Sequence, residues 1–395
     1  MDGPFDVAVI GGGPAGATAA RILAGGGARV CLLDKARFPR PKACGGALSP
    51  RTLRFLPTGV DRLIRTHISR AVFTFASHRP FEVVSASPMA YMICRDEFDA
   101  WLLAEAEAAG VVVRQGEAAL HIERADSKFV VRTSRSRLTI PAVIGADGVN
   151  GTTARLLFPG RPPARYAAFE VEPASPILDG SVEVDVGLYP GGYAWAFPKR
   201  DRLNVGVMVH RSAAARARDL LGGFLSQRGT VLSGDRIRGA FVAAPDATPV
   251  PCAQPGVLLV GDAAHLADPF LGEGIYSAVR SGTLAAQAIL GEASPTGAAA
   301  RYADAVKEAL WPDLVAAARI AMLFHRMPRW WHHLLSRMPN SLRQVATVLG
   351  GEDTYAGLLR RTLAEMENRA GTWIRRQLEL GSPAWQAAPG EERQT

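Results

Sequence analysis

The 395-residue sequence lacks paired cysteines and long hydrophobic runs. Its four cysteines, Cys31, Cys44, Cys94 and Cys252, form no C-x-x-C pair, so neither a zinc site nor a disulfide oxidoreductase is indicated. No window approaches the roughly 18 uninterrupted apolar residues of a membrane span, and the apolar start at Phe5 predicts a strand rather than a signal peptide. We therefore expect a cytoplasmic protein without a bound metal, and leave open a location peripheral to the membrane.

A nucleic-acid-binding motif with interleaved aromatic residues is also absent, although the formal net charge is +8. We therefore expect no nucleic-acid partner. An anionic membrane surface, or a substrate bearing a diphosphate or lipid-like group, would account for the basic charge equally well, as would a solvated basic surface. With 48% hydrophobic residues, the chain can bury one large core or two interleaved cores.

The first recognisable motif is a glycine-rich loop near the N-terminus. The apolar run 5–10 predicts a buried strand, and an alanine-rich helical pattern follows the loop. In the G-x-G-x-x-G pattern, the three glycines allow a tight turn, close approach of a pyrophosphate and helix–strand packing. The cofactor-binding candidates in this loop are Gly11, Gly13, Pro14, Ala15 and Gly16.

A second predicted strand, 29–33, ends in Asp34, which is followed by Lys35. An acidic residue at this place binds the ribose hydroxyls of a dinucleotide. A lone glycine motif is weak evidence, but here strand, loop, helix and acid follow in the required order. We therefore predict that Asp34 and Lys35 contribute to a dinucleotide site.

The stretch from Val257 to Tyr276 predicts a strand, a turn and a helix that hold a flavin. Asp262 follows the buried strand 257–260, where its carboxylate can accept hydrogen bonds from sugar-like hydroxyls. Gly272 and Gly274 are expected to leave bare backbone N–H groups at the start of the helix, and such donors suit the negative charge of a reduced flavin ring. An ordinary strand-to-helix turn is the alternative. The candidates here are Gly261, Asp262, Pro269, Gly272, Gly274 and Ile275.

The chain resembles the p-hydroxybenzoate hydroxylase superfamily of flavoproteins and, within it, the geranylgeranyl reductase family. The resemblance covers nearly the whole length. Besides the glycine loop, it rests on Lys42-Ala-Cys-Gly-Gly-Ala-Leu-Ser-Pro50, Asp147-Gly148, Gly192-Tyr-Ala-Trp-Ala-Phe-Pro-Lys199, Gly261-Asp262, Asp268-Pro-Phe-Leu-Gly-Glu-Gly-Ile275 and Gly351-Glu-Asp-Thr-Tyr355. It implies bound FAD, a two-domain fold and hydrogenation of carbon–carbon double bonds in prenyl chains.

The expected fold class is α/β, with a Rossmann-like FAD-binding domain, an interleaved antiparallel-sheet substrate domain and a C-terminal helical region. Period-two alternation between Tyr166 and Val209 predicts the inserted sheet. The expected ranges are 1–70, 95–160 and 246–300 for the FAD-binding domain, 71–94 and 161–245 for the substrate domain, 301–380 for the helical region, and 381–395 for a flexible tail.

Reducing an alkene requires a hydride from the reduced flavin, a proton donor near the opposite carbon, and exclusion of water. Tyr193, Trp195 and Phe197 alternate along one strand and therefore share a face, either lining an apolar cavity or forming the core of a sheet. Cys44, followed by Gly45, lies in a loop that passes close to the flavin in this superfamily. Its thiol is a candidate proton donor, and loop packing is the alternative.

Three further residues have two interpretations each. Arg95 resembles an arginine that contacts the cofactor in relatives, or is a surface residue at a helix start. Asp147 supports the ribityl or nicotinamide region, or braces the fold. His265 departs from the reductase pattern and resembles aromatic monooxygenases; it is a candidate proton donor, or a histidine hydrogen-bonded within its turn.

The resulting hypothesis is an FAD-dependent reductase acting on an isoprenoid chain of a lipid, quinone or related hydrophobic molecule. His265 keeps open an FAD-dependent monooxygenase for a hydrophobic aromatic or quinone substrate, and a membrane-associated FAD-binding protein without turnover is the third class. No second G-x-G-x-x-G unit marks a nicotinamide domain, so NADPH, ferredoxin and quinol are all candidate electron donors. Segment 311–348, with Trp330 and Trp331 among arginines, predicts either membrane contact or helix packing over a substrate tunnel.

Overall fold

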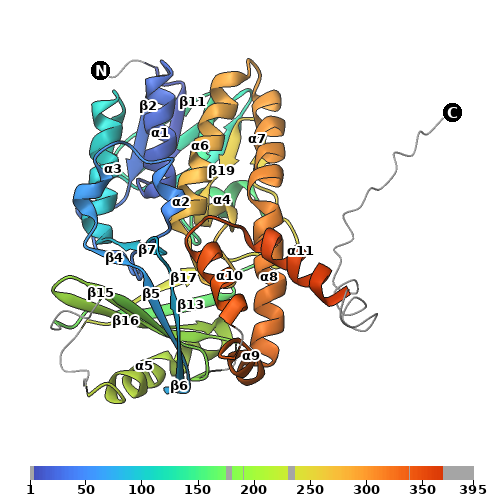
Figure 1. The fold of residues 1–395 in the computed structure, drawn as a ribbon. Coiled ribbons are helices and arrows are strands. Elements are labelled where there is room, and N and C mark those ends of the chain that lie inside the picture. The colour runs from blue at the N-terminus through green and yellow to red at the C-terminus, as the bar shows by residue number, and fades with distance from the viewer. Residues whose placement is uncertain (1–3, 175–179, 190, 230–235, 338, 368–395) are drawn as a thin grey trace.

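Two large sheets organise the chain in the computed structural model, which describes residues 4–174, 180–189, 191–229, 236–337 and 339–367 (Figure 1). A mainly parallel sheet with its helices forms the upper half of Figure 1, a second sheet lies below it, and the C-terminal helices run along one side of both. The predicted α/β class, with a Rossmann-like domain and a second sheet, is confirmed.

The first sheet has the strand order β18-β19-β12-β1-β2-β8. Its strands are β1 (Val7–Ile10), β2 (Val30–Asp34), β8 (Val112–Gln115), β12 (Ala142–Gly145), β18 (Ala253–Gln254) and β19 (Val257–Leu259). All neighbours are parallel except β18 and β19. Because parallel strands place their carboxyl ends at one edge, the motifs that begin at Gly11, Asp34, Asp147 and Gly261 converge there.

Helices and a small sheet complete the core around these strands. Helix α1 packs against both α3 and α6, and α7 packs against α6. The meander β11-β10-β9 contributes Ile122, Phe129 and Val131 to the same core. These elements are α1 (Pro14–Gly25), α3 (Arg95–Ala108), α4 (Thr152–Leu157), α6 (Ile275–Gly291), α7 (Pro295–Ala309), β9 (Ala119–Ala125), β10 (Lys128–Thr133) and β11 (Arg137–Ile140).

The second sheet has seven strands in the order β17-β13-β16-β15-β14-β5-β6. They are β5 (Arg70–Phe75), β6 (His78–Val84), β13 (Tyr166–Val171), β14 (Ser181–Asp185), β15 (Tyr193–Lys199), β16 (Arg202–His210) and β17 (Arg238–Val242). All pairs are antiparallel except β14 with β5. Helix α5 (Ala217–Ser226) packs on the outer face, so the other face is directed toward the first sheet.

Alternation along β15 separates two sets of side chains. Ala194 and Ala196 belong to the core beneath α5, whereas Tyr193, Trp195 and Phe197 lie together on the inner face. The predicted common face of the three aromatic residues is therefore confirmed.

A fourth sheet, the small β3-β7-β4, corrects one expected boundary. Its strands are β3 (Ala47–Leu48), β4 (Thr66–Ile68) and β7 (Ala90–Met92), accompanied by α2 (Pro50–Leu53) and the 3-10 turn η1 (Val60–Leu63). Since β7 pairs with β3 and β4, the part of the substrate sheet expected to reach residue 94 ends at Val84 with β6. Two further 3-10 turns are η2 (Arg211–Arg216) and η3 (Gly261–Ala264).

The described residues after α7 are helical, as predicted. They form α8 (Trp311–Arg326), α9 (Pro328–Leu335), α10 (Pro339–Leu349) and α11 (Tyr355–Glu367). Helix α10 packs on β6, and α11 packs on α8. Residues 368–380 of the expected helical region, and the tail 381–395, lie outside the described residues. Among the helices that are described, none has the length and apolar character needed to cross a bilayer.

Candidate functional site

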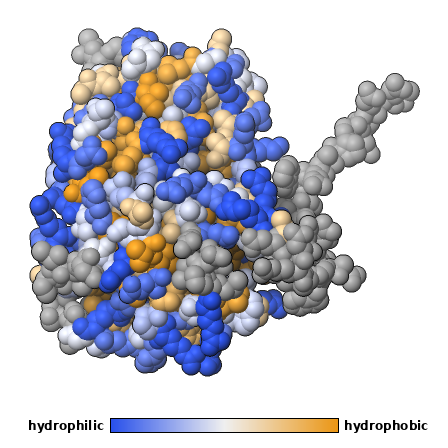
Figure 2. All heavy atoms as spheres, in the orientation of Figure 1, coloured by the Kyte–Doolittle hydropathy of each residue, from blue (hydrophilic) through white to orange (hydrophobic). Residues whose placement is uncertain are grey.

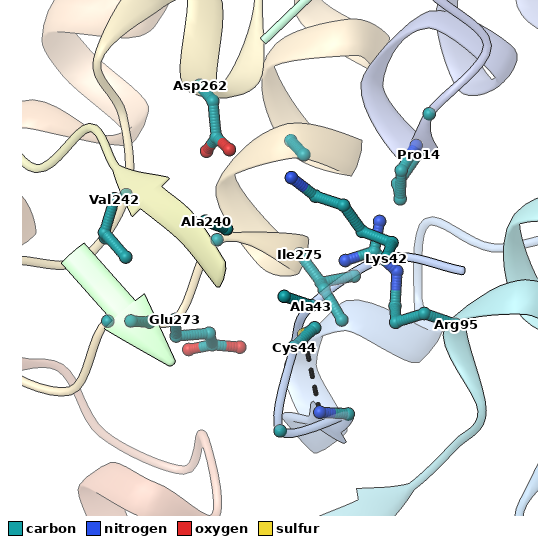
Figure 3. A pocket seen from close by; sticks show the side chains of 18 of the residues that line it. Pro14, Lys42, Ala43, Cys44, Arg95, Ala240, Val242, Asp262, Glu273 and Ile275 are labelled. Atoms are coloured by element: carbon teal, nitrogen blue, oxygen red, sulfur yellow. Dashed lines mark hydrogen bonds between the residues drawn. The ribbon is translucent and has the colours of Figure 1, made fainter. Parts of the chain in front are cut away.

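A cavity of about 640 Å³ lies between the carboxyl edge of the first sheet and the inner face of the second. Figure 3 shows Pro14, Lys42 and Arg95 on one side of it and Asp262, Val242 and Glu273 on the other. It brings together these predicted site residues: Gly11, Gly13, Pro14, Ala15, Asp34, Lys35, Cys44, Gly45, Arg95, Asp147, Tyr193, Trp195, Asp262, Gly272, Gly274 and Ile275. Gly16, Gly261, His265 and Pro269 are not among the lining residues.

The glycine loop has one steric role and one role toward a ligand. A Cβ built on Gly16 would lie 1.9 Å from the carbonyl oxygen of Gly11, so only glycine lets α1 approach the loop this closely. Gly13 is different, because a Cβ built on it would have only Nη2 of Arg40 nearby, at 3.8 Å. The space in front of Gly13 belongs to the cavity and is bordered by a guanidinium, as a pyrophosphate requires.

Asp34 is fixed at the end of β2 by two backbone donors. Its Oδ2 accepts the N–H of Gly12 at 2.7 Å, and its Oδ1 accepts the N–H of Ala36 at 2.7 Å. Each carboxylate oxygen has a second lone pair. The buried carboxylate can therefore also accept the hydroxyls of an adenosine ribose, as the sequence predicted.

Asp147, which follows β12, has one satisfied and one free oxygen. Its Oδ2 accepts the N–H of Thr153 at 2.9 Å and the Thr153 hydroxyl at 3.1 Å, whereas its buried Oδ1 has no partner. Burial raises the pKa of this carboxyl. A buried acceptor without a partner is costly, so Oδ1 on the cavity wall is suited to a hydroxyl of a bound cofactor.

The loop before α6 is organised by Asp268. Its Oδ1 accepts the N–H groups of Phe270 and Leu271 at 2.6 and 3.1 Å. The Asp268 N–H also donates to the Glu273 carbonyl at 2.8 Å, and the Gly272 N–H donates to the Asp268 carbonyl at 3.0 Å. The expectation that Gly272 presents a bare N–H group is therefore wrong. The first-turn amides of α6, beginning at Ile275, have no partners within their helix and face the cavity end of the loop.

Arg51 connects this loop to the C-terminal helices. Its guanidinium lies 3.3 Å from Oε2 of Glu273 and 2.9 Å from Oδ2 of Asp313 in α8, and it stacks over the ring of Tyr276 at 3.9 Å. Asp313 in turn accepts the N–H of Ala356 in α11 at 3.2 Å. Although burial opposes its charge, these carboxylates raise the pKa of Arg51. The helical region is thus fixed to the cavity by a buried cation.

The Cys44–Gly46 loop lies directly against the inner face of the second sheet. A Cβ on Gly45 would be 2.8 Å from the Phe197 ring. The Cys44 N–H donates to Oε2 of Glu170 at 2.9 Å, and the Cys44 carbonyl accepts Nζ of Lys199 at 3.4 Å. The thiol sulfur accepts the Gly46 N–H at 3.4 Å, the dashed line in Figure 3. Both sides of the Cys44 peptide are therefore held by the sheet.

Arg95 begins α3 beneath this loop and lines the cavity. It forms a bidentate pair with the buried Asp99, with donor–acceptor distances of 2.8 and 2.9 Å. Although burial opposes its charge, Asp99 and the neighbouring Cys44 thiol raise the pKa of Arg95. The structure therefore places this arginine at the cofactor cavity, which supports the cofactor-contact interpretation over that of a surface residue.

Tyr193 and Trp195 line the cavity with their polar atoms already engaged. The Tyr193 hydroxyl donates to the carbonyl of Leu271, and the Trp195 indole N–H donates to Oδ1 of Asn204 at 2.7 Å. The ring centroids of Tyr193 and Trp195 lie 5.9 Å apart, and those of Trp195 and Phe197 lie 6.2 Å apart. These residues supply aromatic surface and hold the loop before α6, rather than presenting a free proton.

His265 is buried in the turn after η3 with φ of 58°, away from the cavity lining. Burial, followed by the nearby Arg161, lowers the pKa of its imidazole to about 4, so the ring is neutral at pH 7. A role as proton donor to a ligand in the cavity is therefore not supported. Pro269 lies in a separate hollow with His325 and Arg165.

Several lining residues were missed at the level of sequence. Arg40 and Lys42 come from the basic loop after β2, and Glu170 and Glu273 are carboxylates within apolar or glycine-rich surroundings. A period-two register through β13 would have placed Glu170 on the same face as Ala168, which identifies it as an acid on an apolar face. Glu273 lay inside a recognised motif but was not assigned.

Comparison with known proteins agrees with this geometry. An FAD binding domain family matches residues 4–167. The chain is 30% identical over 364 residues to a digeranylgeranylglycerophospholipid reductase of Methanopyrus kandleri, covering 82% of this chain and 87% of the relative. It is 31% identical over 313 residues to a geranylgeranyl diphosphate reductase of Rhodobacter capsulatus, covering 72% and 75%.

A solved structure has the same fold. The geranylgeranyl bacteriochlorophyll reductase-like protein of Thermoplasma acidophilum superposes with a TM-score of 0.74 at 22% identity, covering 95% of this chain and 99% of that one. The glycine loop, the Asp34 carboxylate and the Asp147 oxygen without a hydrogen-bond partner fit the cofactor that the FAD binding domain implies.

Replacing Gly13 by alanine tests the pyrophosphate position. Its φ of −73° is accessible to any residue. The added methyl would lie in the cavity, no closer than 3.8 Å to Arg40, so the protein should fold normally. FAD affinity should fall about tenfold or more, because the methyl occupies the space through which the backbone approaches the pyrophosphate. Fluorescence titration of the apoprotein with FAD measures the effect. Gly223→Ala on α5, also in open space, is the control, and equal affinities for both variants would contradict the assignment.

Asp268 should make stability depend on pH. Burial raises its pKa to about 6 from 3.8, so the folded state binds more protons than the unfolded state between these values, and stability is lost as pH rises through about 6. The free energy of unfolding of the wild type, relative to Asp268→Asn, should fall by roughly 2 to 3 kcal/mol between pH 4 and pH 7. Urea unfolding across this range measures it, and parallel pH curves would contradict the prediction.

Proposed function

The chain belongs to the geranylgeranyl reductase family of FAD-dependent oxidoreductases, and from this we propose that it saturates carbon–carbon double bonds in an isoprenoid chain carried by a lipid, a quinone or a related hydrophobic molecule. The observation that carries the proposal is a single cavity in which FAD-binding residues meet an apolar sheet face. The printed names of the relatives, a digeranylgeranylglycerophospholipid reductase and a geranylgeranyl diphosphate reductase, support it.

We infer that the glycine loop and Asp34 hold the adenosine diphosphate half of FAD, whereas Asp147, Asp262 and the first turn of α6 hold the flavin half. Bound and reduced, FAD supplies a hydride. The Cys44–Gly46 loop and the loop before α6 then enclose the reacting region, and the Arg51 network fixes their relative position.

Beyond the Cys44 loop the cavity wall is apolar. Its lining there comes from the inner face of the second sheet, from the residue before β7 and from α10: Ala71, Phe73, Val182, Val184, Met89, Val348 and Leu349. Such a wall buries a flexible hydrocarbon chain, at about 25 cal/mol per Å² of apolar surface, and excludes water. Helix α10 therefore closes the substrate end, which supports the interpretation of the C-terminal segment as helix packing over a tunnel.

The monooxygenase hypothesis loses the residue on which it depended. His265 is buried away from the cavity, so its likeness to monooxygenases carries no consequence for a ligand there. For the electron donor, NADPH, ferredoxin and quinol are the three classes to compare.

A basic and apolar patch on α8 and α9 supports peripheral association with an anionic membrane. Met322, Met327 and Trp330 are 55, 47 and 51% exposed, and Arg326 and Arg329 are exposed between them. Trp331 and His332, by contrast, turn inward, toward the Leu323 carbonyl and the Phe81 ring. On the face shown in Figure 2, hydrophobic groups are interspersed among hydrophilic side chains. Aromatic and basic residues together are typical of an interfacial surface.

The reductase proposal is tested without oxygen. Holoenzyme reduced by dithionite is mixed anaerobically with geranylgeranyl diphosphate or a geranylgeranyl-bearing glycerophospholipid. We expect the flavin absorption of the oxidised form to return while the lipid gains two hydrogen atoms per double bond, followed by mass spectrometry. Reoxidation only on addition of oxygen, with oxygen incorporated into an aromatic substrate, would instead establish the monooxygenase activity.

The membrane proposal is tested by sedimentation with vesicles. Wild-type protein should bind phosphatidylglycerol vesicles more than phosphatidylcholine vesicles, because the patch combines arginines with apolar groups. Trp330→Ser should reduce the bound fraction several-fold. Leu290→Ser, at an exposed leucine at the end of α6, is the matched control and should leave binding unchanged. Equal binding of all three proteins would contradict a role for the patch.

A further inference from the structure

We propose that Glu170 is the acid that protonates the alkene in the cavity, a role that rests on the proposed reductase function. Glu170 lies on β13 and points to the inner face of the second sheet, where it lines the cavity. Its side chain is only 2% exposed. Oε2 accepts the Cys44 N–H at 2.9 Å, whereas Oε1 is buried and has no hydrogen-bond partner.

The position of Glu170 places it beside the aromatic residues. Across the sheet, Glu170 is opposite Gly206, and Gly206 is opposite Trp195. The Trp195 ring fills the space where Gly206 lacks a side chain, since a Cβ there would lie 2.1 Å from Cζ2. The indole ring therefore extends over the intervening strand toward Glu170.

This pairing suits the protonation of an isoprenoid double bond. As the proton arrives, positive charge develops on the more substituted carbon of a trisubstituted alkene. The faces of Trp195, Tyr193 and Phe197 can stabilise such a charge, because an aromatic ring is negative on its face. An acid next to an aromatic wall therefore supplies the proton and stabilises the developing positive charge at one place.

The polar and charged groups around Glu170 come from β17, β15, β16, the residue after β13 and the Cys44 loop. Nε of Arg238 on β17 lies 3.5 Å from Oε1. Lys199 on β15 pairs with Glu172, directly after β13, at 2.7 Å, and Arg238 also pairs with Glu172, so these cations are shared with another carboxylate. The Cys44 loop presents its N–H group. Burial outweighs the neighbouring Asn204 amide on β16 and the nearby cations, and the pKa of Glu170 is raised. Its protonated form is thereby favoured.

Other proton-bearing groups in this part of the cavity are less suitable. The Tyr193 hydroxyl donates to Leu271, and Glu273 is paired with Arg51 at 3.3 Å. The Cys44 sulfur accepts the Gly46 N–H at 3.4 Å, and the backbone N–H of Cys44 donates to Glu170 itself. Glu170 combines burial, an oxygen that accepts no hydrogen bond and access to the cavity.

The reaction balances with one two-electron donor. The alkene gains a hydride from the reduced flavin and a proton from Glu170. The carboxyl O–H bond breaks as the new C–H bond forms, and the resulting Glu170 carboxylate takes up a proton from solvent before the next turnover. The two electrons are restored by the donor that reduces the flavin, which is NADPH, ferredoxin or quinol.

Glu170→Gln separates acid catalysis from a structural role. The glutamine retains an oxygen that accepts the Cys44 N–H, so FAD affinity and the flavin spectrum should be unchanged. In anaerobic single turnover of dithionite-reduced holoenzyme with geranylgeranyl diphosphate, flavin reoxidation should slow by about 100-fold or more. The wild-type rate should fall as pH rises through the pKa of Glu170, whereas the variant rate should not follow this titration.

Glu183→Gln is the matched control. Glu183 is a carboxylate of the same sheet, paired with Arg228 beside α5, and its replacement should leave the rate unchanged. An infrared difference measurement adds a readout that does not require turnover. Above the ordinary pH range of glutamate, Glu170→Gln should lose one protonated-carboxyl band relative to the wild type, whereas Glu183→Gln should lose none. Bands from Asp147 and Asp268, whose pKa values are also raised, are common to all three proteins.

Three outcomes would overturn the assignment. A Glu170→Gln enzyme that reoxidises at the wild-type rate removes Glu170 as the acid while the reductase function stands. Identical carboxyl bands in the active wild type and in Glu170→Gln do the same. If no isoprenoid reoxidises the wild-type flavin, the reductase proposal fails, and the acid role fails with it.

Discussion

The two halves of this protein depend on the contact between the Cys44–Gly46 loop and the inner face of the seven-stranded sheet. The loop belongs to the FAD-binding half, yet its peptide donates to Glu170 and accepts from Lys199. Gly45 lets the Phe197 ring approach to a distance that any side chain would prevent. Because hydrogen bonds and steric contact act together, the loop has one position, and that position determines where a flavin ring and an apolar chain can meet.

Electrostatics in the cavity follow from this arrangement. At the carboxyl edge of the first sheet, backbone amides and basic side chains border the cavity and suit a ligand that carries phosphate charge. On the inner face of the second sheet, most lining residues are apolar, and charged groups there are tied into pairs such as Lys199 with Glu172. The apolar end is therefore suited to excluding water, and the basic end to attracting phosphate. A cofactor with a charged half and a ring, next to a hydrocarbon, suits such a gradient.

Much of the FAD half could be predicted because its signals are local. Gly11, Gly13, Gly16 and Asp34 are close in sequence, and each acts on its neighbours through the backbone. Asp262 and Ile275 were predicted for the same reason. His265 was misleading, since a residue inside a motif can turn away from the site; its left-handed backbone and burial direct the ring into the protein. Glu170 was missed because its importance comes from Cys44, 126 positions away.

The sequence by itself determined the fold class, the dinucleotide loop and the common face of Tyr193, Trp195 and Phe197, because periodicity and glycine spacing are set by local backbone geometry. Only the tertiary structure decided which acids share the cavity, which glycine N–H groups are already bonded, and that α10 lines the apolar end. These features depend on burial and on contacts between distant segments. Burial changes both the protonation and the accessibility of a side chain, and neither can be read from its neighbours in the chain.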